Sequence, residues 1–467
     1  MPGPDPTQQL ASLRLDGRLV LPTDEDWDEA RAVWNGMIDR QPTAVLQAAS
    51  PEDVAAGIDA AKTHDLPLAV RGGGHNVAGN STIDGGLVID LGQMNAVGVN
   101  PGTRIVTVAG GSTLGDLDRG TMGYRTAVPA GVVSSTGVGG LTVGGGMGWL
   151  TRAYGLSIDN LLDVYLVTAD GHQVHASPLD NPELFWGVRG GGSNFGVVTR
   201  FEFQGVPLGP EVYAGGAWYM PDKWRAALRF YAEWAPTIPD ELTTIVTWVT
   251  PMEHWDVPER FKGQPVLALT WCWAGRDIDA GEKAVEDLIT ADPDEVLAGP
   301  TPWLDLQTSA DDLFPRGVHA YFKSTYFDDF SDDVIEILAE RSLKRGSPIA
   351  GTDIHQLGGA YGRVAEDATA FGNRDAQYIL NVWGVWKDPA DDAREIAWVR
   401  DFWDAMQPHA RGGHYTNFLG AEEAQEFRLQ TRDSYPPATW DRLVALKDEW
   451  DPTNLFRLNH NIPPSRS

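Results

Sequence analysis

The pattern of apolar and polar positions in the first 210 residues predicts short helices and strands in mixed order. Ser50-Pro51-Glu52-Asp53 has the features of a helix start, with a serine cap, a proline at the first helical position and acids in the first turn. Apolar residues then recur at helical spacing as far as Ala61. The apolar runs at 67–70, 87–91 and 104–109 are typical of buried strands.

Further strands are predicted on either side of an Asp-Gly turn. The runs 163–168 and 173–176 flank Asp170-Gly171, and this dipeptide between two strands is a hairpin signal. A short helix is expected over 181–189, and the alternation in 196–203 predicts a strand. Because helices and strands mix without a repeating strand–helix–strand unit, the fold class that we expect is α+β.

Glycine and tryptophan divide the chain into two regions. Glycine is concentrated between Arg71 and Gly196, whereas four tryptophans occur in residues 1–210 and twelve in residues 211–410. The segment GVPLGPEV at 205–212, which contains glycine and proline, lies where the composition changes. We interpret the first region as a cradle of backbone groups for a nucleotide and the second as an aromatic-rich part that holds a substrate.

Charge and cysteine content exclude several classes of protein. The chain has 65 acidic and 36 basic residues and a net charge of −29, so we expect it to bind neither nucleic acid nor anionic membranes. No apolar run reaches the roughly 18 residues of a membrane helix, and the opening MPGPDPTQQLASLRLDG lacks the features of a secretory signal. The single cysteine, Cys272, excludes an internal disulfide and is interpreted as a buried core thiol, which fits a cytoplasmic location.

Three glycine-rich segments carry the candidate chemistry. Arg71-Gly72-Gly73-Gly74-His75-Asn76 follows a predicted strand and forms either a backbone cradle for a pyrophosphate or a flexible turn with an incidental histidine. The segment 137–148 is also dense in glycine, which indicates either a flat ring against the backbone or close packing of helix on strand, and a third glycine-rich segment occupies 189–196. Neither G-x-G-x-x-G nor a Walker A motif is present, and the histidines lack metal-ligand spacing, so we expect no Rossmann or P-loop fold and no metal.

Taken in order, these segments resemble a known family. RGGGHN at 71–76, PAGVVSSTGVGGLTVGGGMGWLTRAYGLSIDN at 129–160 and GVRGGGSNFGVVTRFEF at 187–203 resemble the FAD-binding domain of the vanillyl-alcohol-oxidase, or PCMH, type. HYTNFLG at 414–420 and WDPTNLFRLNHNIPP at 450–464 resemble the closing segments of the berberine-bridge-enzyme-like oxidases. Within that family, the similarity is greatest to bacterial members of the hydroxynicotine-oxidase type.

The resemblance implies an α+β architecture with two domains. A two-part FAD-binding domain is expected beside a substrate domain whose antiparallel sheet is covered by helices. The expected boundaries are 1–208 for the FAD-binding domain, with a PCMH-type core at about 37–207, then 209–423 for the substrate domain, and 424–467 for a C-terminal segment that returns to the FAD-binding domain.

The resemblance also implies how the cofactor is held. The histidine of the R-G-G-G-H segment bonds covalently to the flavin 8α-methyl group in this family, and His75 occupies that place. Many members add a cysteinyl bond, but Val133 stands at the matching position, so FAD is expected to be covalent through His75 only. Thr136 falls where the family has the residue that influences access of oxygen to the flavin.

Other residues are carried over from the same matched segments. Tyr415 and Asn417 match a tyrosine–asparagine pair near the flavin, and Asn459 matches a late asparagine at its edge. The residues expected to bind FAD are Arg71, Gly72, Gly73, Gly74, His75, Asn76, Gly79, Pro129, Gly131, Val132, Thr136, Gly139, Gly140, Gly144, Gly145, Gly148, Tyr154, Gly155, Asp159, Asn160, Gly196, Val198, Tyr415, Asn417 and Asn459.

The expected catalytic residues are Tyr415, Asn417 and Gln356. Successive side chains of a strand point to opposite faces, so either His355 or Gln356 faces the flavin, and we expect it to be Gln356. Tyr415 is expected to lie in a strand and either to act as general base or to orient the group being deprotonated, and the role of base requires its pKa to fall below the usual value of about 10. Arg411 and His414 are the candidates for lowering that pKa, although His414, adjacent in a strand, would face away.

The activity implied by the resemblance is flavin-dependent oxidation. A hydride would pass from a C–OH or C–N carbon of a small, ring-containing substrate to flavin N5, and O2 would then reoxidise the flavin to give H2O2. The alternatives are a dehydrogenase with another electron acceptor and a flavin-binding protein without turnover. The expected partners are therefore a small-molecule substrate and O2, and the expected state is a monomer or homodimer.

Overall fold

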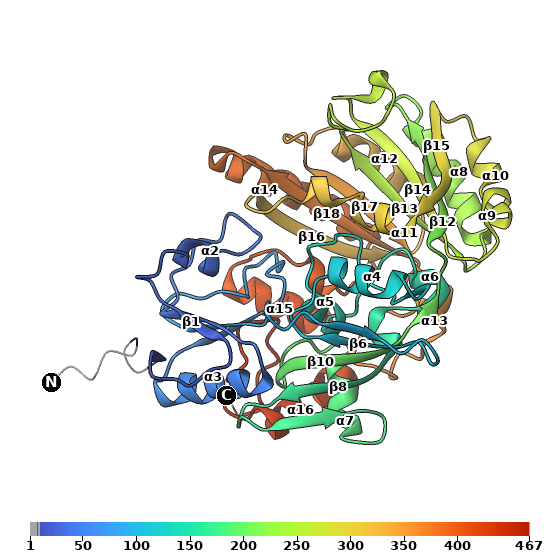
Figure 1. The fold of residues 1–467 in the computed structure, drawn as a ribbon. Helices are drawn as coiled ribbons and strands as arrows, with labels where there is room; N and C mark the ends of the chain where they lie inside the picture. The colour runs from blue at the N-terminus through green and yellow to red at the C-terminus, as the bar shows by residue number, and fades with distance from the viewer. Residues whose placement is uncertain (1–6, 8–9, 467) are drawn as a thin grey trace.

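Four β-sheets organise the described part of the chain, which comprises residue 7 and residues 10–466 in a computed structural model. Residues 1–6 and 8–9, within the opening segment that was interpreted as lacking a secretory signal, lie outside the described residues. Figure 1 shows the four- and five-stranded sheets with their helices in the lower half of the molecule and the seven-stranded sheet with its helices at the upper right. Helices and antiparallel sheets are both present, so the expected α+β class is confirmed.

The first sheet has the strand order β1-β2-β4-β3, in which β2, β4 and β3 are parallel and β1 is antiparallel to β2. Helix α3 begins as predicted, because the Ser50 side chain accepts a hydrogen bond from the backbone N–H of Asp53. Buried Ile58 of this helix packs in one core with Leu46 and Ile89 of the strands. The elements are β1 (Arg18–Val20), α2 (Trp27–Arg31), β2 (Ala44–Gln47), α3 (Pro51–Thr63), β3 (Leu68–Arg71) and β4 (Leu87–Asp90).

The second sheet is antiparallel throughout, with the order β5-β6-β10-β8-β9. Strands β8 and β9 pair as the hairpin predicted around Asp170-Gly171. The strands are β5 (Val97–Val99), β6 (Ile105–Ala109), β8 (Leu161–Val167), β9 (Gln173–Ala176) and β10 (Val197–Gln204), and β7 (Thr126–Ala127) pairs separately with β11 (Val206–Pro207). The helices of this region are α4 (Leu114–Met122), α5 (Val138–Val143), α6 (Thr151–Tyr154) and α7 (Pro182–Val188).

The third large sheet has seven antiparallel strands in the order β15-β12-β14-β13-β17-β18-β16. Its strands are β12 (Glu211–Tyr219), β13 (Leu242–Val249), β14 (Val266–Trp273), β15 (Glu295–Pro302), β16 (His319–Phe327), β17 (Gly351–Gln356) and β18 (Tyr378–Trp386). Its helices are α8 (Trp224–Trp234), α9 (Ile278–Ala284), α10 (Glu286–Ile289), α11 (Trp303–Thr308), α12 (Asp332–Ser342), α13 (Ala360–Arg363) and α14 (Asp392–Met406).

The two faces of the seven-stranded sheet differ in what covers them. Helices α8, α12 and α14 pack on one face, and the shared core includes Trp224, Leu338, Phe402 and, from the strands, Ile354 and Leu380. Since side chains alternate along a strand, the neighbours of Ile354 on β17 point to the opposite face, toward the first two sheets. Cys272 on β14 is fully buried, so its interpretation as a core thiol is confirmed.

The last helices return to the first half of the molecule. Leu443 and Leu446 of α16 (Pro437–Trp450) pack in one core with Phe185 of α7 and with Phe195. Figure 1 shows α16 beside α7 at the bottom of the view, and α15 (Ala424–Asp433) precedes it. None of the helices among residues 10–466 is long and apolar enough to span a membrane.

Candidate functional site

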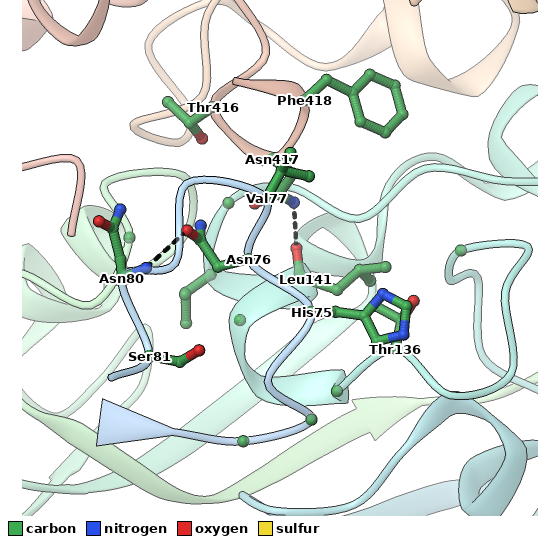
Figure 2. Close-up of a pocket in the computed structure, with 18 of the residues that line it drawn as sticks. His75, Asn76, Val77, Asn80, Ser81, Thr136, Leu141, Thr416, Asn417 and Phe418 are labelled. Atoms are coloured by element: carbon green, nitrogen blue, oxygen red, sulfur yellow. Dashed lines mark hydrogen bonds between the residues drawn. The ribbon is translucent and has the colours of Figure 1, made fainter. Parts of the chain in front are cut away.

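A cavity lies between the glycine-rich loops of the first half and the inner face of the seven-stranded sheet. Residues from many parts of the chain line it, among them the loop after β3 (72–77), the loop before α5 (131–137), strands β17 and β18, the segment 415–418, and the C-terminal segment 456–460. Figure 2 shows how the loop that carries His75 and the segment that carries Asn417 approach the cavity from different directions. Residues more than 300 positions apart in the sequence therefore meet at one place.

The two glycine-rich loops cross with their backbones in contact. A Cβ atom on Gly73 would lie 2.4 Å from the backbone nitrogen of Gly137, and one on Gly137 would lie 2.3 Å from that of Gly73. No side chain fits such a gap between two backbones, so the crossing requires glycine on both sides. The crossing places His75 over the second loop, beside Thr136 (Figure 2).

His75 is half-buried and opens into the cavity. Its ring stacks on the Trp34 indole with a centroid separation of 4.9 Å, and its Nε2 lies 2.7 Å from Ser135 Oγ. The surrounding protein displaces water from the ring and, together with the charge of Arg316, lowers the pKa of His75 to about 4. The imidazole is therefore uncharged near neutral pH, and the uncharged form is the nucleophile.

The loop before α5 is held by residues of α11 and of the turn after it, which follow strand β15 of the seven-stranded sheet. The Asp311 carboxylate accepts hydrogen bonds from Ser134 N and Oγ at 2.8 and 2.5 Å, and Gln307 Nε2 donates to the Gly131 carbonyl at 3.1 Å. Gln307 Nε2 also donates to Asp118, a buried carboxyl whose pKa burial raises to about 6. The loop under His75 is thus fixed by both halves of the fold.

Tyr415 and Asn417 form a hydrogen-bonded pair at the cavity. The backbone N–H of Gly146 and the side-chain amide of Asn417 both donate to Tyr415 Oη, at 3.0 and 2.9 Å, and Asn417 Nδ2 also donates to the Leu141 carbonyl at 3.0 Å. Burial raises the pKa of Tyr415 to about 12, although these donors act in the opposite direction. The lowered pKa that a tyrosine base requires is therefore absent.

The expected strand around Tyr415 is wrong. Residues Thr416–Phe418 form a 3-10 turn, and Gly412 and Gly413 before it adopt φ values of +88° and +77°, which end any extended run. The candidates for lowering the tyrosine pKa lie elsewhere. Arg411 pairs with Asp328 and Asp375, and His414 lies near the Ser324 carbonyl and the Trp403 ring.

The expected choice of Gln356 over His355 is also wrong. The two side chains do point to opposite faces, but Gln356 lies on the face of Ile354 under the helices, where Thr244 Oγ1 donates to it and it donates to the Ala235 carbonyl. Asp353 and His355 line the cavity instead, together with Asn381 of β18, which pairs with Asp353 in the sheet register. The sequence did contain a signal for this choice. Apolar Ile354 is the residue of this strand that is expected to pack in the core, so Asp353 and His355 on either side of it had to face the opposite side of the sheet.

About half of the residues expected to bind the cofactor line the cavity. They are Gly72, Gly73, Gly74, His75, Asn76, Gly131, Val132, Thr136, Gly140, Gly144, Tyr415, Asn417 and Asn459. Val133, which stands where many relatives were expected to have cysteine, lines it as well. Lining residues that sequence reasoning missed include Trp34, Phe314 and Phe322, whose aromatic rings belong to segments without a motif, and Phe418, which lies within HYTNFLG but was not singled out.

The other residues that were expected to bind FAD do not line the cavity. They make packing contacts, strand pairs, hydrogen bonds or ion pairs within the surrounding fold. A Cβ atom would come within 2.9 Å of a neighbouring atom at six of them, which are therefore close-packing positions: Gly79, Gly139, Gly145, Gly148, Gly155 and Gly196. Arg71 pairs with Asp90 at 2.8 Å, and Val198 pairs with Leu166 between β10 and β8. The carbonyls of Pro129 and Tyr154 accept hydrogen bonds from Ser157 and Asn160, and Asp159 pairs with Arg374.

Comparison with known proteins identifies the family. Residues 42–177 match the family described as FAD binding domain, and residues 415–463 match the family described as berberine and berberine like. The chain is 30% identical over 471 residues to YvdP, an FAD-linked oxidoreductase of Bacillus subtilis (strain 168), covering 98% of this chain and 100% of the relative. The chain belongs to the berberine-bridge-enzyme-like FAD-linked oxidoreductases.

Relatives within this family extend the comparison. The chain is 28% identical over 483 residues to (R)-6-hydroxynicotine oxidase of Paenarthrobacter nicotinovorans, covering 97% of this chain and 98% of the relative. The solved structure of 6-hydroxy-D-nicotine oxidase from Arthrobacter nicotinovorans superimposes with a TM-score of 0.86 at 25% identity, covering 97% of this chain and 99% of that one. As a berberine-bridge-enzyme-like protein, the chain is an enzyme that uses FAD.

Several polar atoms at the cavity have no hydrogen-bond partner in the protein, as expected for a site that binds FAD. Asn80 Nδ2, Ser81 Oγ, Asn459 Oδ1 and His460 Nε2 line it, are buried, and have no hydrogen-bond partner among the described residues. Buried polar groups in native proteins are nearly always paired, so these donors and acceptors indicate a polar ligand. The backbone N–H groups of Gly72 to Gly74 add donors of the kind that bind phosphate.

Proposed function

We propose that this enzyme carries one FAD bound covalently through His75 alone and oxidises a small, ring-containing organic molecule at a C–OH or C–N carbon. The observation that carries the proposal is the position of His75, which opens into the cavity at the crossing of two glycine-rich loops in a chain of an FAD-linked family. The bound flavin would accept a hydride at N5 and pass two electrons to O2, which gives H2O2. Val133 offers no second point of attachment.

The enzyme's own residues would hold the cofactor and shape the substrate chamber. Ser135 Oγ, 2.7 Å from Nε2, fixes the orientation of the His75 ring, and the glycine loop presents N–H groups for the pyrophosphate. Trp34, Phe314 and Phe322 lie within 6.4 Å of one another, ring centroid to ring centroid. Such a cluster excludes water and favours a flat or ring-shaped substrate.

The remaining features of the proposal follow from the sequence. The boundaries at 208 and 423 separate a substrate domain built on the seven-stranded sheet from an FAD-binding domain that includes α16. We further propose that the enzyme is a cytoplasmic monomer or homodimer, because its single buried cysteine forms no internal disulfide and its net charge of −29 disfavours binding to nucleic acid or anionic membranes.

Two measurements test this function. Protein precipitated with acid should stay yellow, and a peroxide-coupled assay over ring-containing alcohols, amines and sugars should detect substrate-dependent H2O2. Stopped-flow mixing of the reduced enzyme with air-saturated buffer separates an oxidase from a dehydrogenase, since an oxidase reoxidises much faster than free flavin. Reoxidation over minutes, with rapid turnover on a quinone or dye, would show that another acceptor is used.

A further inference from the structure

Asp353 and His355 place an ionisable pair on the substrate side of the cavity. Both belong to β17 and are separated by Ile354, which packs under the helices, so both point into the cavity. The sheet register sets Asn381 of β18 opposite Asp353. Because the positions lie in the middle of a seven-stranded sheet rather than on a loop, the backbone holds the group rigidly.

Asp353 and His355 have few hydrogen-bond partners within the protein. His355 Nε2 lies 3.4 Å from Asp353 Oδ1, and neither ring nitrogen of His355 has a hydrogen bond within residues 10–466. Asp353 Oδ1 and Asn381 Oδ1 are buried and also have no hydrogen-bond partner among the described residues. These three side chains are therefore free to bind groups on a substrate that donate hydrogen bonds.

Few of the described side chains that line the cavity around His355 are charged. Of the described residues that line the cavity, Asp353 is the only carboxylate, and none is a lysine or arginine. Asn381 on β18 faces it across the sheet and carries no charge. The titratable side chains that share the cavity with His355 are His75, Asp353, Tyr415, Tyr435 and His460. The nearest fixed charge is thus a carboxylate, which stabilises an imidazolium once a proton arrives.

Tyr415 is poorly suited to accept that proton. Its oxygen already accepts hydrogen bonds from Gly146 and Asn417, and burial raises its pKa to about 12. Phe418 lies between the two candidates, with its ring 4.9 Å from that of Tyr415 and 6.0 Å from that of His355. His355 is thus the imidazole that β17 presents to the cavity beside a carboxylate, and a neutral imidazole has a ring nitrogen that can accept a proton.

We propose that His355, oriented by Asp353, is the catalytic residue that takes the proton from the substrate. The inference rests on the proposed function, in which FAD is the oxidant. The O–H or N–H bond of the substrate breaks, its proton goes to a ring nitrogen of His355, and the electron pair forms the C=O or C=N bond. The adjacent carbon loses its hydrogen as hydride to the flavin, so two electrons and two hydrogens leave the substrate.

Anaerobic stopped-flow reduction of the flavin tests the assignment. The probe is the compound that reduces the wild-type flavin fastest among a panel of benzyl alcohol, benzylamine, cyclohexanol and D-glucose. His355→Gln should lower the limiting rate of flavin reduction roughly 10²–10⁴-fold, the range for a lost acid–base group, with unchanged covalent flavin content. Asp353→Asn, which keeps the base but removes the charge that orients it, should lower the rate less.

A matched control and two further readouts separate catalysis from structure. His172 forms an exposed pair with Asp170 at 2.8 Å on the β8–β9 turn, so His172→Gln should change the rate less than two-fold. The rate in His355→Ala should recover with added imidazole, and the acid limb of the wild-type pH profile should be missing in His355→Gln. Near-normal flavin reduction in His355→Gln, or an unchanged acid limb of its pH profile, would overturn the assignment of His355. If no compound of the panel reduces the wild-type flavin, the result counts against the proposed function itself.

Discussion

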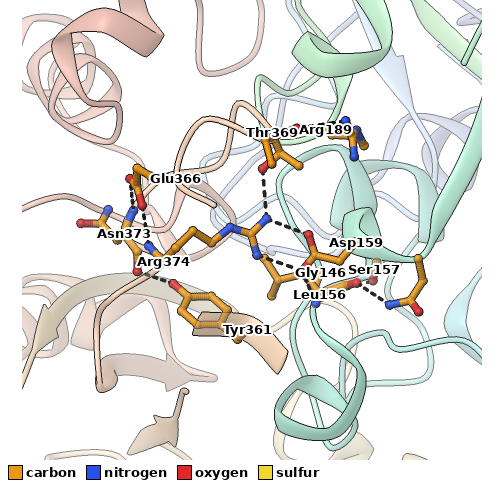
Figure 3. Close-up of polar contacts among 12 residues, drawn as sticks. Gly146, Leu156, Ser157, Asp159, Arg189, Tyr361, Glu366, Thr369, Asn373 and Arg374 are labelled. Atoms are coloured by element: carbon orange, nitrogen blue, oxygen red, sulfur yellow. Dashed lines mark hydrogen bonds and ion pairs between the residues drawn. The ribbon is translucent and has the colours of Figure 1, made fainter. Parts of the chain in front are cut away.

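Arg374 donates both terminal guanidinium nitrogens to the carboxylate of Asp159, at 2.7 and 2.8 Å, and both side chains are nearly inaccessible to solvent. Figure 3 shows this pair bridging the loop around Glu366 and Asn373 to the turn of Leu156 and Ser157. The same Arg374 loop carries Phe371, whose ring packs at 5.9 Å against Tyr415. The ion pair therefore joins the loop between α13 and β18 to the turn that follows α6, and Phe371 of that loop contacts a tyrosine that lines the cavity.

Removing one partner of this pair should destabilise the fold. Arg374→Met leaves the Asp159 carboxylate buried without its cation, which costs about 3–5 kcal/mol in the free energy of unfolding. Denaturant unfolding should show this loss, and Arg374→Met combined with Asp159→Asn should lose less. The control is Arg225→Met, because its pair with Glu336 is exposed and contributes less than about 1 kcal/mol. An unchanged unfolding midpoint for Arg374→Met would show that the pair contributes nothing.

The loop crossing predicts a specific loss of cofactor. Gly73→Ala would bring a Cβ atom to 2.4 Å from the Gly137 nitrogen, so the loops must separate and His75 must move. We expect the ratio of flavin to protein to fall while the far-ultraviolet circular dichroism stays near that of the wild type. Gly123→Ala, where a Cβ atom meets nothing within 4 Å, is the matched control. Full flavin content in Gly73→Ala would contradict the crossing.

Tyr415→Phe separates a structural tyrosine from a catalytic base. Without Oη, the Gly146 N–H loses its acceptor, and an unpaired buried group costs about 1–3 kcal/mol of stability. Since burial raises the pKa of Tyr415 to about 12, the phenol stays neutral from pH 6 to about pH 10. The pH profiles of flavin reduction in Tyr415→Phe and in the wild type should therefore have the same shape. A basic limb that disappears in the variant would restore the tyrosine as base.

The pKa of His75 predicts how flavin attachment depends on pH. Because desolvation lowers this pKa from the ordinary 6.5 to about 4, the nucleophilic form predominates at every pH above about 4. Covalent attachment of added FAD to the apoprotein should therefore proceed at the same rate at pH 7.5 and at pH 5.5, as measured by flavin fluorescence of the denatured protein. A steep fall between those two values would indicate an imidazole with an ordinary pKa.

Features that depend on residues close together in the sequence could be predicted from local sequence patterns. The cap at Ser50, the Asp170-Gly171 hairpin and the burial of Cys272 follow from short-range patterns, and the structure has all three. The extended run expected through Tyr415 fails because Gly412 and Gly413 take left-handed conformations, which HYTNFLG alone does not reveal.

The cavity depends on contacts that the sequence does not show. Phe314 precedes β16, Phe322 lies on β16 and Asn381 lies on β18, so these residues reach the cavity only through the order of the seven strands. For His355 and Gln356, alternation along the strand was correctly predicted, but the choice of face needed the position of the helices over Ile354. The pairing of Arg374 with Asp159 spans 215 positions and carries no local signal.

The mass of the intact, denatured protein tests the central claim most directly. Attachment through His75 predicts the mass of the polypeptide plus one FAD, with the flavin located by peptide mapping on the peptide that contains His75 and with Cys272 unmodified. His75→Gln should have the mass of the polypeptide alone. A wild-type mass without FAD, with all flavin released into the acid supernatant, or a flavin on the Cys272 peptide, would contradict the account.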